Sequence, residues 1–256
     1  MREQTMTTRN TYDVPALRRA HDVLMVLAQA SKPVRASTLV QATGLSRSTL
    51  YLLLDSLESR HWVEKRGDGY IVGVKLFELG SAYVRHDGLQ AAFRDEASAY
   101  VAAHNEVVQL AVLDGAEVVY IAREDAQRPV RLVSDLGSRL PAHCCALGKA
   151  LLSSLPDQEV CSLLPDRLAA MTPNTTTRRG ALLRELAGIR ACGLATEREE
   201  VSLGLACFAA YVGVTPLGKR VAVSTSVPLE RLDARREKQI ATAIARVASR
   251  IAATLQ

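Results

Sequence analysis

The sequence predicts an α+β protein with two domains: a small helical one at the N-terminal end, and a larger one built on an antiparallel sheet. Two observations carry this prediction. Before residue 60 the apolar residues recur with helical spacing, and two short β-prone runs around a Gly-Asp-Gly turn follow. After residue 104 most apolar residues fall in strand-length runs that alternate with helices. A chain of 256 residues is long enough for two such domains.

Composition and spacing place the domain boundaries. Residues 1–12 are polar and have little to bury, so we expect a flexible tail there. The first domain is expected at residues 13–73, a linker helix at 74–90 and the second domain at 91–256. Because the linker helix has too small an apolar face for a core of its own, we expect it to pack against a neighbouring segment or a second subunit.

The charge and the cysteine content limit the class of protein. A net charge of +5 and a pI near 9.1 agree with a polyanionic partner without requiring one. The five cysteines have no CxxC spacing, which indicates buried reduced thiols rather than a disulfide framework or a zinc ribbon. The longest apolar run in the C-terminal part, residues 205–214, is well below the roughly 20 residues that cross a bilayer. Residues 1–11 contain no apolar signal segment, so we expect a cytoplasmic protein that does not enter a membrane.

Residues 38–57 are typical of a helix-turn-helix. Gly44 supplies the turn, because glycine adopts a positive φ at little cost, and Ser46 stands where an N-cap oxygen would accept bonds from free helix amides. The apolar stripe of the second helix has the spacing i, i+3, i+4 and i+7, and consists of Leu50, Leu53, Leu54 and Leu57. In this motif the second helix enters the DNA major groove and its N-terminal residues meet the base edges. A helical hairpin within an all-α core is the alternative.

The flanking segments favour DNA binding over that alternative. A helix is expected from Pro15 to about Ala30, ended by Lys32-Pro33. Residues 62–72 predict a β-hairpin, and a hairpin directly after a recognition helix is the wing of a winged helix. Basic residues at its tip would contact phosphates, which contribute affinity but little sequence information. The predicted DNA contacts are Ser46, Arg47, Ser48, Thr49, Tyr51, Lys65 and Arg66.

The second domain is predicted to contain two β-hairpins, a further strand and several helices. The clearest hairpin joins residues 107–113 to 117–123 through Asp114-Gly115, which favours a type I′ turn with two positive φ values. A third strand is expected at Pro129–Ser134. The other hairpin is expected at 208–215 and 219–226, and the helices at 91–104, 146–154, 178–192 and 233–253. A mainly antiparallel sheet flanked by helices is the simplest arrangement of these elements.

Several motifs stand out in order along the chain. In the N-terminal part they are ATGLSRSTLYLLLDSL and WVEKRGDGYIVGVKLFELG. In the C-terminal part they are LGSRLPAHCCALGKALLSSLP (136–156), GLATEREEVSLGLACFAAYV (193–212) and AVSTSVP (222–228). With these motifs the sequence resembles the IclR-type bacterial transcription regulators over nearly all of residues 13–253. The resemblance implies a winged helix-turn-helix domain and a helical linker, followed by an effector-binding domain with a GAF-like sheet. It also implies dimers that often pair into tetramers.

Members of that family sense small metabolites, frequently carboxylates, in a pocket of the second domain. By resemblance, the effector contacts are Ala146 and Leu147 in the loop before Gly148-Lys149, together with Glu197, Cys207, Ser224 and Ser226. The residue types suit this role, because hydroxyls two residues apart on a strand share a face and amides at a helix start favour an anion. Without the resemblance, the serines could face solvent, Cys207 could be core and Glu197 could be one more exposed carboxylate.

The sequence departs from the family pattern at two positions. The family commonly has Asp where this chain has Glu197, and a carboxylate one methylene longer would narrow or redirect the pocket. The recognition helix of the family often carries a basic residue where Leu52 stands, so one DNA contact is expected to be absent. The identities of the effector and of the operator therefore do not follow from the resemblance.

An enzyme built on His143, Cys144 or Cys145 is the alternative function. Gly148-Lys149 does not belong to a phosphate-binding loop, because that motif requires Gly where His143 stands and Ser or Thr where Ala150 stands. Neighbouring residues on an extended chain point to opposite faces, which disfavours a thiol-histidine pair, and the spacing of the His and Cys residues gives no zinc motif. We therefore expect no enzyme, cofactor or metal. The expected protein is a transcription regulator, a homodimer that can pair into a tetramer. It would bind a near-palindromic DNA operator and a carboxylate or aromatic acid.

Overall fold

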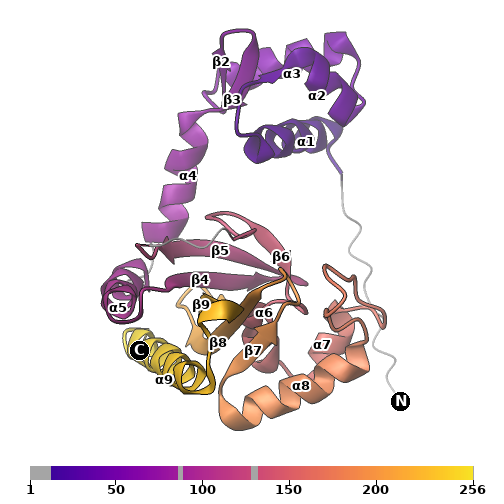
Figure 1. The fold of residues 1–256 in the computed structure, drawn as a ribbon. Helices are drawn as coiled ribbons and strands as arrows, with labels where there is room; N and C mark the ends of the chain where they lie inside the picture. The colour runs from indigo at the N-terminus through magenta and orange to yellow at the C-terminus, as the bar shows by residue number, and fades with distance from the viewer. Residues whose placement is uncertain (1–12, 86–88, 128–131, 256) are drawn as a thin grey trace. The chain divides into compact units, whose positions relative to one another are not determined.

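The computed structural model describes residues 13–85, 89–127 and 132–255, which form two compact units (Figure 1). The first unit ends at Arg85 and the second follows it. Residues 1–12, predicted as a flexible tail, lie outside the described residues. The class is α+β, as predicted, with helices and a small sheet in the first unit and an antiparallel six-stranded sheet with helices in the second.

The first unit combines three helices with a three-stranded antiparallel sheet. The helices are α1 (Pro15–Gln29), α2 (Ala36–Thr43) and α3 (Arg47–Glu58), and the strands are β1 (Val34–Arg35), β2 (Val63–Arg66) and β3 (Gly69–Val72). The sheet order β1-β3-β2 confirms the predicted wing hairpin and adds a third strand to it. Strand β1 was not predicted because two residues carry no periodic pattern, and only pairing with β3 defines it.

The turn between α2 and α3 has the local structure that the sequence indicates. Gly44 follows α2 with a φ of +68°, and its amide donates to the Val40 carbonyl (2.9 Å). Ser46 is the N-cap of α3, and its Oγ accepts a hydrogen bond from the Thr49 amide (3.2 Å). The leucine stripe of α3 faces the core of the unit, with Leu50, Leu54 and Leu57 buried and Leu53 half-buried. The helix-turn-helix is confirmed, and the all-α alternative is wrong because a sheet completes the unit.

Helix α4 (Val74–Arg85) follows the wing and leaves apolar side chains exposed. Val74 and Phe77 are one helical turn apart and both are exposed, Phe77 by 76%. Gly88, where we expected this helix to end, lies outside the described residues. The first described element of the second unit is α5 (Leu89–His104).

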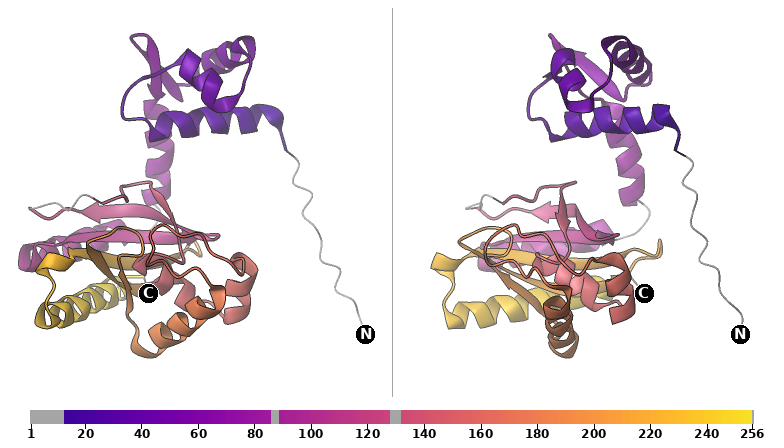
Figure 2. Two further views of the ribbon diagram at one scale, coloured as in Figure 1. Left: turned by 45° about the vertical axis from the view of Figure 1, so that its right-hand side comes forward. Right: turned by 90° about the vertical axis from the view of Figure 1, so that its right-hand side faces the viewer.

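The six strands of the second unit are antiparallel and have the order β6-β5-β4-β9-β8-β7. They are β4 (Val107–Asp114), β5 (Glu117–Glu124), β6 (Arg139–Pro141), β7 (Ala195–Arg198), β8 (Leu205–Val214) and β9 (Arg220–Pro228). Helices α5 and α9 (Ala234–Ala252) cover one face of the sheet (Figure 2). On the other face lie α6 (Ala146–Ser153), α7 (Asp157–Leu163) and α8 (Arg179–Cys192). A short 3-10 helix, η1 (Leu229–Arg231), joins β9 to α9.

The third strand predicted at Pro129–Ser134 is wrong in its described part. Residues 129–131 lie outside the described residues, and residues 132–134 form no strand. The strand beside β5 is β6. Side-chain hydrogen bonds, and not strand pairing, position Ser134. Gln109 Nε2 donates to Ser134 Oγ (3.1 Å), and Arg123 Nη1 donates to the Ser134 carbonyl (2.9 Å).

The turn of the β4-β5 hairpin differs from the predicted type, although the hairpin itself is confirmed. Asp114 pairs with Glu117, so the loop consists of Gly115 and Ala116. Of these residues only Gly115 has a positive φ, at +61°. A type I′ turn requires two such residues, whereas glycine at the first central position is typical of type II′.

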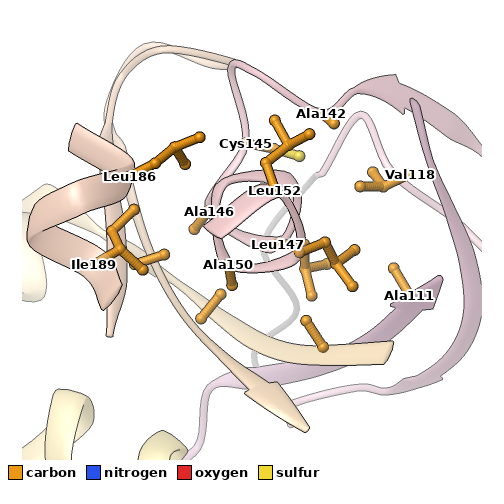
Figure 3. Close-up of a cluster of buried hydrophobic side chains, with 14 of the residues drawn as sticks. Ala111, Val118, Ala142, Cys145, Ala146, Leu147, Ala150, Leu152, Leu186 and Ile189 are labelled. Carbon is orange, nitrogen blue, oxygen red and sulfur yellow. The ribbon is translucent and has the colours of Figure 1, made fainter. Parts of the chain in front are cut away.

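Strand alternation gives the sheet a core on each face. Small residues on the α6 side, among them Ala111 of β4, let α6 lie close to the sheet. Figure 3 shows Leu147 and Ala150 of α6 between Ala111 and the α8 side chains of Leu186 and Ile189. The start of α6 also approaches its own preceding loop closely. Gly148 makes this possible, since a Cβ there would lie 2.1 Å from the Ala142 carbonyl oxygen.

Candidate functional site

Helix α3 presents a mainly polar surface on the side away from the core of the first unit. Arg47, Ser48 and Tyr51 are exposed, and Thr49 is half-buried. The Ser46 hydroxyl is engaged at the helix start, with Oγ 2.9 Å from Thr49 Oγ1 and 3.1 Å from Ser48 Oγ. The ion pairs found in the described part of the first unit do not involve Arg47. The exposed side chains at the start of α3 are thus positioned to reach a partner.

The two basic residues predicted at the wing lie in β2, directly before the β2-β3 turn, and are exposed. Arg66 Nη2 is 3.2 Å from Glu64 Oε2, and Arg35 Nε is 2.6 Å from Asp68 Oδ2 on the other side of the wing. Exposed pairs of this kind contribute little stability, so a phosphate can compete for the guanidinium. Lys65 forms no ion pair with any residue that the structure describes.

The residues predicted to contact an effector line a single cavity in the second unit. They are Ala146, Leu147, Glu197, Cys207, Ser224 and Ser226. The sequence did not predict the polar wall residues Gln109, Tyr120, Ser134 and Ser202. The sequence could have indicated Gln109, because it is the one polar residue inside an apolar strand. A buried polar side chain of this kind needs a hydrogen-bond partner, such as a ligand or another side chain. Tyr120 and Ser134 carried no such signal.

Register places the polar wall residues side by side. Glu197 of β7, Cys207 of β8 and Ser226 of β9 are direct partners across three neighbouring strands. Cys207 Sγ is 3.2 Å from Ser226 Oγ. Ser224 lies two residues from Ser226 on the same face and pairs with Gln109 of β4. Both serines and Glu197 are buried, so the readings of solvent-facing serines and an exposed carboxylate are wrong.

The first turn of α6 closes one end of the cavity. Ala146 and Leu147 belong to this helix and not to a loop before it, because Cys145 is the N-cap and its Sγ accepts a hydrogen bond from the Gly148 amide (3.3 Å). The Ala146 and Leu147 amides donate to no described residue. Free amides at a helix N-terminus, with the positive end of the helix dipole, favour an anionic group.

The cavity opens to solvent, and its empty volume, with the mouth included, is about 410 Å³. Side chains of Leu132, Val133, Ser134, Val201, Ser202 and Leu205 form part of its wall.

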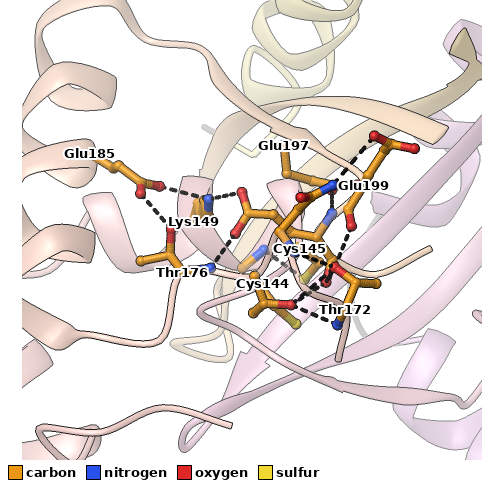
Figure 4. A network of polar contacts seen from close by, with 12 residues as sticks. Cys144, Cys145, Lys149, Thr172, Thr176, Glu185, Glu197 and Glu199 are labelled. Atoms are coloured by element: carbon orange, nitrogen blue, oxygen red, sulfur yellow. Dashed lines mark hydrogen bonds and ion pairs between the residues drawn. The ribbon is translucent and has the colours of Figure 1, made fainter. Parts of the chain in front are cut away.

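A polar network around the buried cation Lys149 adjoins the cavity residue Glu197 (Figure 4). Lys149 of α6 is 1% exposed, and its Nζ pairs with Glu200 and, at 2.7 Å, with Glu185 Oε2 of α8. Burial lowers the pKa of Lys149, but the bonds to both carboxylates outweigh burial, and the net pKa is raised. The Glu200 amide donates to Glu197 Oε2 (2.9 Å), which links this cation to the cavity. The Thr176 amide completes the network by donating to Glu200 Oε2 (3.1 Å).

Burial also changes the titration of the cavity residues. It raises the pKa of the Glu197 carboxyl above its ordinary value, with the Glu200 charge adding to the effect. It raises the pKa of the Cys207 thiol well above the ordinary range. Hydrogen bonds from Cys207 and from the Glu200 amide act in the opposite direction on the Glu197 carboxyl, but burial is the larger effect.

The residues of the enzyme hypothesis are buried and engaged in structural bonds. His143 Nε2 is 2.8 Å from the Ala169 carbonyl oxygen, and Cys144 Sγ donates to the Pro141 carbonyl (3.2 Å). Burial raises the pKa of Cys144, and it raises the pKa of Cys145 to about 12. The thiolate is the nucleophilic form of cysteine, and neither thiol is activated in this way.

The described residues, 13–85, 89–127 and 132–255, contain no group of three or more His, Cys, Asp or Glu side chains that could hold a metal ion. Within the same ranges, no helix has both the length and the apolar character needed to cross a membrane.

Both units match known domain families. Residues 16–67 match the family described as IclR helix-turn-helix domain, and residues 82–253 match the family described as Bacterial transcriptional regulator IclR C-terminal. A curated relative, the HTH-type transcriptional regulator Rv1719 of Mycobacterium tuberculosis, is 33% identical over 240 residues, covering 90% of this chain and 88% of the relative. The HTH-type transcriptional repressor AllR of Klebsiella pneumoniae is 31% identical over 220 residues, covering 85% of this chain and 81% of the repressor.

Among solved structures, an IclR homolog complexed with 4-hydroxybenzoate from Microbacterium hydrocarbonoxydans has a TM-score of 0.80 and 25% identity. The alignment covers 94% of this chain and 98% of that chain. These families consist of transcription regulators, so the enzyme hypothesis for His143, Cys144 or Cys145 is wrong. The protein belongs to the IclR family of bacterial transcription regulators, with a DNA-binding helix-turn-helix unit and an effector-binding C-terminal unit.

Proposed function

We propose that the cavity at the start of α6 binds a small organic acid, and that binding changes the affinity of the first unit for a near-palindromic operator. The observation that carries this proposal is the convergence of six predicted effector contacts on one cavity. The resulting change in DNA occupancy would repress or activate transcription. The coupling between the two sites would be roughly 1–3 kcal/mol, which changes DNA affinity by about 5 to 150-fold.

The composition of the cavity supports an acid with an apolar body. The free amides of Ala146 and Leu147 and the hydroxyls of Ser224 and Ser226 are donors that suit a carboxylate. The remaining wall is largely apolar, contributed by Leu132, Val133, Leu140, Val201 and Leu205, and favours a hydrocarbon or aromatic part.

The solved relative in complex with 4-hydroxybenzoate supports an aromatic acid as one candidate class. Glu197 argues against transferring the identity of that ligand directly. Its side chain lines the cavity and is one methylene longer than that of aspartate, so it takes up space that an aspartate would leave free. Small aliphatic acids are therefore an equal part of the proposal.

A thermal-shift screen of the full chain against benzoate, 4-hydroxybenzoate and short aliphatic acids tests the effector proposal. A ligand at 100 times its Kd should stabilise the second unit by roughly 2.7 kcal/mol. The double variant Ser224→Ala, Ser226→Ala should lose this shift. Thr225→Val is the matched control, because Thr225 lies between the two serines, is fully buried and has a hydroxyl that bonds to no other described residue. An unchanged shift in the double variant would reject the assignment of these serines to the site.

For DNA we propose that the N-terminal half of α3 reads the major groove, while Lys65 and Arg66 contact phosphates. The predicted contacts Ser46 and Thr49 would then act chiefly by shaping the helix start, since their side chains bond to each other. Arg47→Ala should weaken binding to the intergenic DNA beside the protein's own gene, measured by a mobility shift at fixed salt. Arg184→Ala, an exposed arginine of α8 in the other unit, should leave binding unchanged. Equal affinity of the Arg47→Ala variant and the wild type would reject this assignment.

We also propose that the protein acts as a homodimer that can pair into a tetramer. The exposed Val74 and Phe77 on one side of α4 support a second copy as the partner, because a soluble helix rarely leaves such residues uncovered. Two copies would place their recognition helices on half-sites about 34–36 Å apart. Sedimentation equilibrium of the wild type and of Phe77→Glu measures the change in mass. A dimeric Phe77→Glu variant would show that α4 is not the interface.

A further inference from the structure

The exposed face of α3 carries an apolar side chain at its centre. Successive residues of a helix are rotated by about 100°, so Ser48, Leu52 and Asp55 lie on one side, opposite the buried stripe that begins at Leu50. Leu52 is 74% exposed, more than any other leucine among the described residues. Its neighbour Tyr51 is 55% exposed. The second turn of the recognition helix thus presents apolar surface where a partner would meet it.

The surroundings of Leu52 indicate which partner this surface fits. On the same side of the helix it is flanked by exposed polar residues, Ser48 before it and Asp55 and Ser56 after it. A protein interface would require a larger continuous apolar area than one leucine and the edge of one tyrosine. The basic residues Arg47, on the same helix, and Lys65, on the wing, instead favour a polyanion.

We propose, resting on the proposed reading of the major groove by α3, that Leu52 is a specificity-determining residue that selects operator positions by contact with the 5-methyl group of thymine. This methyl is the apolar group on the major-groove edge of the base pairs, and leucine can contribute only through apolar contact. At a G·C pair the same side chain would cover donors and acceptors without bonding to them, which is unfavourable. Tyr51, adjacent along the helix, extends the apolar contact toward the next base or sugar.

Replacement of thymine by deoxyuridine tests this proposal, because it removes the methyl group and keeps base pairing. Operator duplexes are first selected from a randomised library with the wild-type full chain, and each thymine is then replaced in turn. Affinities are measured by fluorescence anisotropy at one salt concentration. We expect at least one thymine whose replacement weakens binding about fourfold, as for the loss of one buried methyl group.

The Leu52→Ala variant identifies the residue responsible. It should bind the thymine duplex about fourfold more weakly than the wild type does, and it should be insensitive to deoxyuridine at that position. Leu217→Ala, an exposed leucine in the β8-β9 turn of the other unit, is the matched control and should keep the full deoxyuridine effect. Circular dichroism checks that both variants are folded.

A second variant gives an independent readout. Leu52→Lys should shift the selected base at that position toward guanine, whose O6 and N7 accept hydrogen bonds from lysine. The proposal is overturned if no thymine replacement exceeds a twofold effect, or if Leu52→Ala retains the deoxyuridine effect. It is also overturned if Leu52→Ala changes only the mass of the protein in solution, which would place Leu52 at a contact between copies.

Discussion

Replacing the buried cation Lys149 with methionine should destabilise the second unit strongly. The variant keeps the length of the side chain but leaves Glu200 and Glu185 without their shared partner. Lys149 is 1% exposed and the Glu200 side chain is 10% exposed, so water cannot readily replace the ammonium group. Removal of one partner from a buried ion pair leaves an uncompensated charge and typically costs about 3–5 kcal/mol.

The expected loss of stability in Lys149→Met comes mainly from the unpaired charge of Glu200. The Glu185 side chain is 37% exposed and can hydrate, so its share should stay below about 1 kcal/mol. A total loss of about 3–5 kcal/mol would lower the melting temperature of a unit of this size by roughly 6–20 °C, at about 2–4 °C per kcal/mol. Glu200→Gln in the Lys149→Met background should recover part of the loss, because it removes the buried charge.

The sequence offers a convenient way to separate the two units in this experiment. Trp62 is the sole tryptophan and belongs to the first unit, so its emission follows that unit during urea unfolding, while circular dichroism follows both. Lys149→Met should shift the circular dichroism transition and leave the tryptophan transition in place. Lys75→Met, which removes an exposed pair with Glu78 (2.8 Å), should change stability by less than about 0.5 kcal/mol. A loss below about 1 kcal/mol for Lys149→Met would refute the reasoning.

Three further predictions concern the cavity, its helix and the recognition helix. Because folding raises the pKa of Glu197, the native state holds the carboxyl proton more tightly than the unfolded state does. The free energy of unfolding of the wild type, measured by urea titration, should therefore rise relative to that of Glu197→Gln as pH falls through the raised pKa. A decrease over the same pH range would contradict this prediction. Gly148→Ala should lower the free energy of unfolding by about 1–3 kcal/mol or more, because the added Cβ would overlap the Ala142 carbonyl. Gly188→Ala, where the added Cβ meets open space, should instead raise it by about 0.5–1 kcal/mol in the same urea titration. Ser46→Ala should remove the N-cap of α3 and lower the stability of the first unit by about 1 kcal/mol. Tryptophan emission should then change at a lower urea concentration, and an unchanged midpoint would rule out a stabilising cap.

Local patterns account for what could be predicted of the first unit. The turn glycine, the N-cap Ser46 and the leucine stripe of α3 are interactions between residues a few positions apart, and the structure contains each of them. Local patterns did not predict the short strand β1. They also placed a strand at 129–134, whereas the strand that pairs with β5 is β6. Strands of two or three residues have no period of their own and form only when a longer strand is available to pair with them.

The candidate site shows the same division. The resemblance assigned six cavity residues by motif, but Gln109, Tyr120 and Ser134 reach that cavity from segments without a motif. The thiols of Cys144 and Cys145 could have been reactive or inert on sequence grounds. Burial decides for the inert form, because desolvation raises the pKa of both.

The sequence by itself determined the two-domain α+β class, the helix-turn-helix with its wing and the two long hairpins of the large sheet, because periodicity, caps and turn residues act over a few positions. Only the tertiary structure decided that Lys149, Glu185 and Glu200 form one buried network, and that Glu197, Cys207 and Ser226 stand in one row. It also decided that Leu52 is the exposed centre of α3. Burial, charge pairing and register across strands depend on residues far apart in the chain, and no local pattern records them.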